Sequence, residues 1–362
     1  MVGNRKPTSC LVVGNYCHDV LMKDDVVLGE SLGGAAAFVS AVLDGVAVPS
    51  TVVAKVGPDF AYPVTHPPSV IPSSGTTLFH AHFSSQVQRQ DRVLRRVRAC
   101  DPIGPSDLPE SRRFDFGLAV GVGGEILPDT LEKMLDICET VLVDVQALIR
   151  VFDGGDGTVR LVKLRDSGFY HLLPRIGFLK ASSDEAPYID VDQAKNACCV
   201  VLTNGEEGCR VHYRDVEQHI APFPSVQVDP TGAGDSFLGG LVFGLVQGLN
   251  VPDAALLGNF FGSLTVSHVG LPKFDLGLLQ AVKNEVQRKK LQLFSCREEL
   301  NEKLVFAKPL DHDDFHKSLV RAKNLPLSHQ ECQLELPPGS SQVTLFSGNS
   351  HDEPIKLGNG IP

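Results

Sequence analysis

Short apolar runs recur along the chain, and segments with the composition of buried helices separate them. A run of this length that ends in glycine or a polar residue is typical of a buried strand in a parallel sheet. Such runs lie at Cys10–Val13, Val52–Val56, Phe116–Val120, Val141–Val143, Ile176–Leu179 and Cys199–Leu202. Apolar segments typical of helices lie at Leu127–Cys138, Phe237–Leu249 and Asn259–Gly270. Because the two kinds of segment alternate between about residues 10 and 290, the pattern predicts an α/β fold with three layers and a mostly parallel sheet.

The loop Asp229–Phe237 carries the clearest chemical signal in the chain. It reads DPTGAGDSF and joins a strand-like run, Ser225–Val228, to an apolar helix. Its glycines let the backbone approach a ligand closely, and the first N–H groups of a helix are free to bind a phosphate. A carboxylate at Asp235 could then deprotonate an alcohol that attacks phosphorus. The alternative is a helix start in which Asp235 only caps the N–H groups and no ligand binds.

The nine residues of this loop closely resemble the C-terminal signature of the ribokinase, or phosphofructokinase-B, family of sugar and nucleoside kinases. The resemblance implies a ribokinase-like three-layer sandwich with a small β-lid that covers the substrate. It implies that ATP donates the phosphoryl group and that Mg²⁺ takes part. It also implies that the backbone of Gly232, Ala233 and Gly234 forms the anion hole, and that Asp235 is the catalytic base.

Two further stretches resemble the family at the positions where it binds its substrate. Asp19 stands five residues after Gly14, and the resemblance implies that its carboxylate accepts hydrogen bonds from substrate hydroxyls; an aspartate that caps a turn is the alternative. The backbone of Gly33 and Gly34 would lie against a polyol. Phe38 stands where the family usually has a substrate-binding asparagine. That difference makes a ribose or fructose substrate less expected than another polyol.

The resemblance also implies a nucleotide site in the second half of the chain. Glu185 corresponds to a family glutamate that holds magnesium or its water, and Ser182 replaces the asparagine that accompanies it. Arg150 could reach phosphates or form a surface salt bridge. The residues implied to bind ATP are Ser182, Thr203, Asn204, Gly205, Glu206, Gly208, Thr231, Gly232, Gly234 and Asn259.

The resemblance places the β-lid at about residues 20–30 and 77–98. Within the family, three segments resemble the plant members that phosphorylate myo-inositol; they lie at 91–97, 99–103 and 143–146. They imply an ATP-dependent kinase that makes myo-inositol 3-phosphate, a step toward phytate. The alternatives are a kinase for another sugar or nucleoside, a non-catalytic regulatory member of the family, and a nicotinamide-dependent enzyme built on the glycines at 117–124.

Composition limits the partners of the protein. The chain has 362 residues, a formal net charge of −10 and a pI near 5.6, which argues against a nucleic-acid or anionic-membrane partner. The nine cysteines show no disulfide or zinc spacing, and Met1–Cys10 lacks the apolar core of a secretion signal. We expect a cytoplasmic protein, either a monomer or a homodimer. The nonpolar stretch Ala254–Leu271 contains Asn259 and His268 and is expected to be a buried helix.

The character of the chain changes beyond Lys289. We expect a kinase domain over residues 1–295 and a poorly ordered extension over 296–362, because the extension has little apolar periodicity and ends in a Pro-, Gly- and Ser-rich segment. The cluster Asp311–His316 could bind a metal, although a solvated acidic segment is the expected state.

Overall fold

A computed structural model of the chain describes residues 8–24, 26–83, 93–110, 112–295 and 305–324. The chain divides into two units, residues 1–327 and 328–362. The second unit lies wholly outside the described residues, as do parts of the expected lid, at 84–92, and of the expected extension, at 296–304. All of the described residues belong to the first unit.

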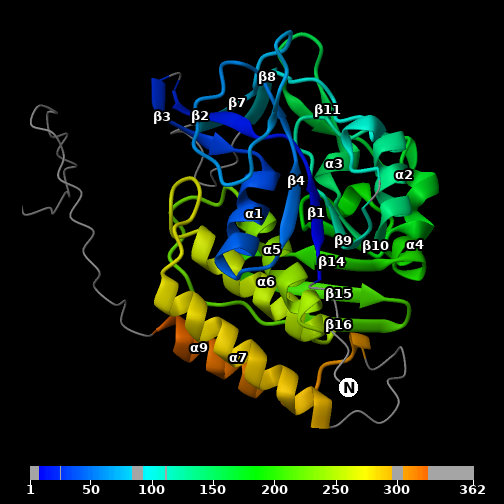
Figure 1. Cartoon of the computed structure of the whole chain (residues 1–362), viewed down its shortest axis with the longest axis vertical. Coiled ribbons are helices and arrows are strands. Elements are labelled where there is room, and N and C mark those ends of the chain that lie inside the picture. The colour runs from blue at the N-terminus through cyan, green and yellow to red at the C-terminus, as the bar shows by residue number, and fades with distance from the viewer. Residues whose placement is uncertain (1–7, 25, 84–92, 111, 296–304, 325–362) are drawn as a thin grey trace, which may run out of the picture. The chain divides into compact units, whose positions relative to one another are not determined.

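An eight-stranded sheet forms the centre of this unit (Figure 1). The strands pair in the order β16-β15-β14-β13-β10-β9-β1-β4, and the pairs from β14 to β4 are parallel. Only β15 and β16 add antiparallel pairs at one edge. This arrangement confirms the predicted α/β fold. The strands span Cys10–Val13 (β1), Ser50–Val53 (β4), Phe114–Ala119 (β9), Cys138–Asp144 (β10), Phe178–Ser182 (β13), Cys199–Thr203 (β14), Cys209–Tyr213 (β15) and Val216–Ile220 (β16).

Helices cover both faces of the sheet because alternate strand residues face opposite sides. In β1, Cys10 and Val12 belong to one buried cluster, and Leu11 and Val13 belong to the other. The first cluster is completed by α1 (Ala35–Gly45), α5 (Ala233–Val246), α6 (Val251–Thr265), α7 (Leu276–Ser295) and α9 (His312–Lys323). The second is completed by α2 (Pro128–Ile137), α3 (Gln146–Ile149) and α4 (Val191–Ala197).

Short elements connect the layers. Two small sheets pair β5 (Lys55–Val56) with β6 (Ser69–Val70), and β11 (Arg150–Phe152) with β12 (Val159–Leu161). The 3₁₀ helices are η1 (Pro105–Asp107), η2 (Leu164–Asp166), η3 (Tyr170–Arg175), η4 (Ala186–Tyr188) and η5 (Gly205–Glu207).

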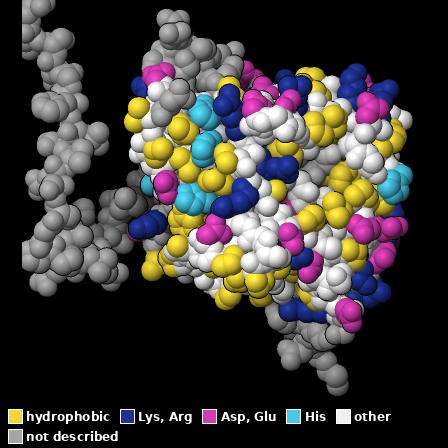
Figure 2. Space-filling view, turned by 90° about the horizontal axis from the view of Figure 1, so that it is seen from above, with side chains coloured by type: hydrophobic (Ala, Val, Ile, Leu, Met, Phe, Trp, Pro, Cys, Tyr) yellow, Lys and Arg dark blue, Asp and Glu magenta, His cyan; other side chains and the backbone are white. Residues whose placement is uncertain are grey.

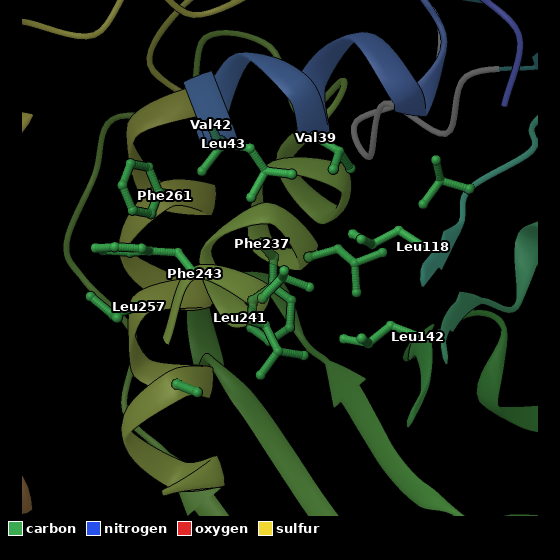
Figure 3. Packing of buried hydrophobic residues seen from close by; sticks show 14 of the residues in the cluster. Val39, Val42, Leu43, Leu118, Leu142, Phe237, Leu241, Phe243, Leu257 and Phe261 are labelled. Atoms are coloured by element: carbon green, nitrogen blue, oxygen red, sulfur yellow. The ribbon is translucent and has the colours of Figure 1, made fainter. Parts of the chain in front are cut away.

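Helices α5 and α6 pack closely because small residues line their contact. A Cβ atom built on Gly240 would lie 2.5 Å from the carbonyl oxygen of Leu257. Around this contact, side chains from α1, α5 and α6 meet those of β9 and β10 (Figure 3). The core therefore holds α5 along its buried face.

A second sheet stands at the carboxyl end of β1. It has the order β3-β2-β7-β8 and consists of Cys17–Lys23 (β2), Val26–Gly33 (β3), Thr77–Phe83 (β7) and Val93–Arg98 (β8). These strands fall at the two segments where the lid is expected. Asp19 of β2 pairs with Phe79 of β7, and both face a pocket. The intervening residues, among them His18 and His80, face the opposite side.

Histidine side chains gather on the face drawn in Figure 2, among hydrophobic and basic side chains. On the second sheet, the ring centroids of His80 and His82 are 5.9 Å apart, and His18 lies 2.9 Å from Glu30. Burial and the neighbouring rings lower the pKa of His80.

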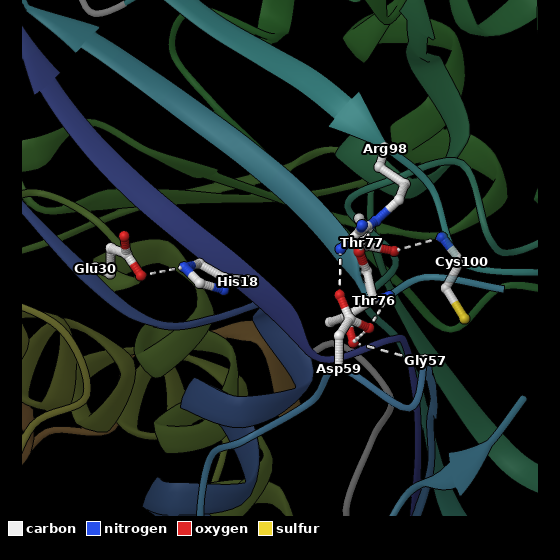
Figure 4. A network of polar contacts seen from close by, with 8 residues as sticks. All are labelled: His18, Glu30, Gly57, Asp59, Thr76, Thr77, Arg98 and Cys100. Carbon is white, nitrogen blue, oxygen red and sulfur yellow. Dashed lines mark hydrogen bonds and ion pairs between the residues drawn. The ribbon is translucent and has the colours of Figure 1, made fainter. Parts of the chain in front are cut away.

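A polar network holds the base of the second sheet (Figure 4). Asp59 accepts hydrogen bonds from the backbone and the hydroxyl of Thr76, at 2.8 and 2.9 Å, and forms an ion pair with Arg98. Arg98 also donates to the carbonyl of Thr76. Burial acts to raise the pKa of Asp59, but these hydrogen bonds and Arg98 outweigh it and lower the pKa. The start of β7 and the end of β8 are thus tied to one turn.

The structure differs from the sequence-based expectations at Ser225–Val228 and in the segment that contains α9. Ser225–Val228 forms no strand, because its backbone follows the end of α6, where Val228 donates to the carbonyl of Val266. Part of the segment expected to be poorly ordered is the helix α9, whose Phe315 and Leu319 are buried in the core. His312 in the same segment is buried and bonded, so the cluster is not a solvated acidic run.

The seven described cysteines are free and buried, and Cys198 and Cys199 form no bridge with each other. Burial raises the pKa of Cys10 to about 12, so its thiol is unreactive at neutral pH. Within the described residues, no helix combines the length and the apolar character needed to cross a membrane.

The substitution Gly240→Ala should destabilise the protein by about 1–3 kcal/mol, because the new methyl group must separate α5 from α6. Urea unfolding followed by circular dichroism measures the change. Gly29→Ala is the matched control: Gly29 lies in β3, and no atom lies within 4 Å of the position that its new methyl group would take, so its effect should stay within ~0.5 kcal/mol. Equal losses for both variants would contradict the close contact.

Candidate active site

The loop before α5 is ordered by its own side chains. The carboxylate of Asp229 accepts hydrogen bonds from the backbone and the hydroxyl of Thr231, at 2.9 and 2.6 Å. Gly232 then takes a left-handed conformation, with φ of 75°, and begins the helix. A Cβ atom at Gly232 would overlap the ring of Phe38. Only glycine fits here, so the first N–H groups of α5 are presented without a covering side chain.

One pocket, the lid pocket, lies between the second sheet and this loop. Its polar lining comes from Asp19, Ser31, Gln146, Arg150, Asp229, Thr231 and Asp235. Its apolar lining includes Leu21, Phe38, Phe79, Leu94 and Val122. The cavity volume is only about 80 Å³. The pocket therefore suits a compact ligand with apolar faces and a polar edge.

A second pocket, the helix pocket, lies on the other side of the loop. It is lined by Thr203, Gly205, Glu206 and Gly208 at the end of β14, by residues 222–225 and Gln227, and by Ala233, Gly234, Asn259 and Ser263. Its cavity volume is about 450 Å³, several times that of the lid pocket. Gly232 lines the first pocket, and Ala233 and Gly234 line the second. The loop is therefore the partition between the two pockets.

Asp235 stands in the first turn of α5 at the floor of the lid pocket. Its Oδ1 atom accepts a hydrogen bond of 3.1 Å from the side chain of Gln146. Burial raises the pKa of Asp235, while the positive charges of Lys180 and Arg150 oppose the rise. Asp235 thus binds a proton more readily than an exposed aspartate, which suits a base.

Lys180 is the cation beneath the loop, and sequence analysis missed it. It lies in β13 and forms a buried ion pair with Asp144 of β10, at 3.0 Å. Burial raises the pKa of Asp144 to about 6 despite this partner. Burial alone would lower the pKa of Lys180, but Asp144, Glu185 and Asp235 together raise it, so Lys180 stays charged. A Cβ atom on Gly234 would lie 2.7 Å from the Lys180 Nζ atom.

Glu185 adds a third carboxylate near the same cation. Its Oε2 atom accepts hydrogen bonds from the backbone and the hydroxyl of Ser182, at 2.8 and 3.0 Å. Burial acts to raise the pKa of Glu185, but Lys180 and the bonds from Ser182 outweigh it and lower the pKa. Glu185 is therefore held ionised. Among the described residues, no three His, Cys, Asp or Glu side chains form a metal-binding cluster.

The structure brings most of the expected ligand-binding residues to one of the two pockets. Asp19 and Gly34 line the lid pocket, and the carboxylate of Asp19 lies over Gly33, where a side chain would overlap it. Thr231 and Arg150 also line the lid pocket. Arg150 is thus not the surface salt bridge that was the alternative for it.

Three residues expected to bind the nucleotide have other contacts. Ser182 lines neither pocket, and its hydroxyl donates to Glu185. Asn204 does not line the helix pocket; its amide donates to the carboxylate of Glu207 in an exposed turn. Asn259 does line it, but its Nδ2 atom donates to the carbonyls of Ile220 and Ala221, at 3.1 and 2.9 Å. This amide nitrogen shapes the pocket wall.

The glycine-rich loop after β9 is already occupied by a side chain of the protein. The carboxylate of Glu125 accepts hydrogen bonds from the backbone of Asn15, Val122 and Gly123, at 2.9, 3.2 and 2.7 Å. These are the N–H groups that a dinucleotide phosphate would need. The glycines at 117–124 therefore provide no nicotinamide site.

Comparisons with known proteins agree with this geometry. The model of the pfkB family of carbohydrate kinases matches residues 178–273. The chain is 60% identical over 316 residues to an inositol 3-kinase of Arabidopsis thaliana, covering 86% of this chain and 87% of the relative. It is 54% identical to an inositol 3-kinase of Oryza sativa subsp. japonica, covering 87% and 82%.

Solved structures share the fold at low identity. A pyrophosphate-dependent kinase of the ribokinase family, complexed with a pyrophosphate analogue and myo-inositol, superposes with a TM-score of 0.61. The identity is 17%, over 78% of this chain and 99% of the other.

The substitution Lys180→Met should destabilise the protein by about 3–5 kcal/mol at pH 7, because it leaves the buried Asp144 carboxylate without its partner. The loss should shrink as the pH falls. Without the ammonium, the folded-state pKa of Asp144 lies further above its unfolded value, so protonation in acid removes the unpaired charge. Urea unfolding at several pH values measures both effects.

The matched control for this variant is Lys195→Met, which removes a lysine whose ion-pair partner, Asp192, is exposed. Its effect should remain below about 1 kcal/mol at every pH. If Lys180→Met lowered the free energy of unfolding by less than about 1 kcal/mol, or if its effect grew in acid, the buried ion pair between Lys180 and Asp144 would be contradicted.

Proposed function

The chain belongs to the pfkB family of carbohydrate kinases, alongside the plant inositol 3-kinases, and we propose that it transfers the γ-phosphoryl group of ATP to the 3-hydroxyl of myo-inositol. The observation that carries the proposal is the position of the loop, with a small pocket on one side, a large pocket on the other and a carboxylate at the boundary. Phosphoryl transfer needs the two reactants to meet end to end across such a boundary.

The lid pocket matches the chemistry of a cyclitol. The two faces of an inositol ring present C–H groups, and its rim presents hydroxyls. Phe38, Phe79 and Leu94 supply apolar walls, while Asp19 supplies a hydrogen-bond acceptor. Phe38 occupies the position of the usual family asparagine and is only 1% exposed, so it offers the ring packing in place of an amide contact.

In the proposed reaction Asp235 takes the proton of the attacking hydroxyl as that oxygen bonds to the γ-phosphorus. The bond between this phosphorus and the β–γ bridging oxygen breaks, and ADP leaves. The N–H groups at Gly232–Gly234 stabilise the negative charge on the transferred group. Lys180 lies below the loop and adds a positive charge that needs no reorganisation during the reaction.

The carboxylate of Glu185 fits a magnesium ion, because it is ionised and Mg²⁺ in kinases is held by one or two carboxylates together with phosphates and water. Ser182 would orient Glu185 through its two hydrogen bonds. The ion would neutralise phosphate charge when bound.

The helix pocket favours ATP over pyrophosphate as the donor. Pyrophosphate would need only the anion-binding loop, whereas the pocket extends beyond it along Phe223, Pro224 and Gly262. An apolar extension of this kind provides a surface for a purine base. Its volume of about 450 Å³ is consistent with a nucleoside.

The substitution Asp235→Asn should lower kcat by roughly 10²- to 10⁴-fold, the usual contribution of a general base. MgATP should still bind, because the loop backbone is unchanged. Steady-state kinetics and calorimetry measure the two effects. Asp215→Asn, in the exposed turn between β15 and β16, is the control and should leave kcat unchanged. Near-normal turnover by Asp235→Asn would exclude Asp235 as the base.

The purified protein should convert myo-inositol and MgATP to myo-inositol 3-phosphate. NMR identifies the phosphorylated carbon, and chiral chromatography must follow, because the 1- and 3-phosphates are mirror images. A panel with fructose, ribose, inosine and pyrophosphate tests the other substrates and the other donor. Faster turnover of any of these would contradict the proposed pair of substrates.

A further inference from the structure

Helix α9 is anchored at its first turn to the kinase core. His312 lies 2.6 Å from the carboxylate of Asp253, which belongs to α6. Lys289 of α7 lies 3.0 Å from the same carboxylate and also pairs with Asp311. Asp253 and Lys289 are fully enclosed, at 0% and 1% exposure. Three helices are therefore joined through one buried group of charges.

From this anchor, one face of α9 runs along the outside of the helix pocket. The ring of His316 meets the ring of Phe223 edge-on, with centroids 4.7 Å apart. Seven residues later, Lys323 donates hydrogen bonds to the carbonyl of Pro224 and to the hydroxyl of Ser263, at 2.7 and 2.8 Å. Residues i and i+7 lie on the same side of a helix, two turns apart.

The three partners of this face are themselves lining residues of the helix pocket: Phe223, Pro224 and Ser263. The segment that contains Phe223 and Pro224 belongs to no helix or strand, so no strand or helix ladder of backbone hydrogen bonds fixes it. The contacts between this segment and α9 are therefore among the interactions that fix its position. Ser263 lies in α6, and its carbonyl accepts a hydrogen bond of 2.6 Å from Ser225, so Lys323 joins this segment to α6 beside that bond.

We propose that α9 is a structural part of the nucleotide site and that Lys323 is a positioning residue, which sets ATP affinity by fixing residues 222–225 against α6. The inference rests on the proposed function, since it takes the helix pocket to be the ATP site. It assigns a role to a segment whose sequence carries no nucleotide-binding motif.

The burial of the Lys323 ammonium group agrees with a positioning role for this residue. Burial lowers the pKa of Lys323 to about 8, so the folded protein holds the ammonium in a site that disfavours its charge. A lysine on a helix surface avoids such a site by extending into water. Here the side chain instead lies against two acceptors that define the pocket.

The test compares the full chain with Lys323→Met, which removes both hydrogen bonds and keeps an unbranched side chain. The Kd for MgATP, measured by calorimetry, and the KM for ATP should rise roughly 3- to 10-fold, the equivalent of about one net hydrogen bond. The KM for myo-inositol and kcat should stay within twofold. Lys323→Arg, which retains the donors, should restore most of the ATP affinity.

Lys317→Met is the matched control, because Lys317 is a lysine of the same helix that is 70% exposed and pairs with Asp314 at the surface. It should change none of the four constants. Should Lys323→Met fail to fold in thermal unfolding, His316→Leu removes the contact with Phe223 from the same face and should give the same rise for ATP alone.

Two results would overturn the inference. One is an unchanged Kd for MgATP in the folded Lys323→Met variant. The other is an equal weakening for ATP and myo-inositol with a lowered melting temperature, which would indicate general destabilisation. A wild-type chain that binds no MgATP would instead overturn the proposed function, and the inference with it.

Discussion

The close packing around the start of α5 is the constraint on which the site depends. The ring of Phe38 fills the space next to Gly232, and the ammonium of Lys180 fills the space next to Gly234. A side chain at either glycine would collide with one of these groups. The backbone between them is therefore held in one place, at the boundary of the two pockets. The proposed anion binding therefore depends on how tightly the two sides of the loop are filled.

Charge is arranged around the same point. Asp144, Glu185 and Asp235 come from three different elements, and each raises the pKa of Lys180. Three buried carboxylates near one another would be costly without a cation, since each would take up a proton in preference to remaining charged. One lysine lets Glu185 stay ionised and limits the rise in the pKa of Asp235. Lys180 thus acts on the protonation of both Glu185 and Asp235.

The sequence predicted the sheet, the loop and most of the lining residues because each depends on local pattern. Alternating apolar runs define the strands, and DPTGAGDSF defines the loop by its glycines. Lys180 was missed because it stands at the end of an apolar run and its partner, Asp144, lies 36 residues away in the chain. Asn204 was misplaced because a motif gives the position of a residue in the chain and not the direction of its amide.

The helix α9 shows a different limit of sequence analysis. Its composition is polar, with Asp313, Asp314 and Lys317 on one side, and averaging over the segment hides the few residues that are buried. Phe315 and Leu319 are four apart and enter the core together. His312 is polar yet buried, because Asp253 receives it. The sequence alone does not show that His312 is buried, because its partner Asp253 in α6 lies 59 residues away in the chain.

Phe38 links the lining of the lid pocket to the geometry of the loop before α5. Its ring lines the lid pocket and also contacts the glycine that begins α5. A smaller amide at this position would offer the substrate a hydrogen-bond partner, but it would also leave a gap beside Gly232 and loosen the loop. In this chain, one ring thus contributes both to the apolar character of the lid pocket and to the packing of the loop backbone. A phenylalanine here favours a substrate that can pack C–H groups against its ring, and the chair of the proposed cyclitol substrate offers such groups.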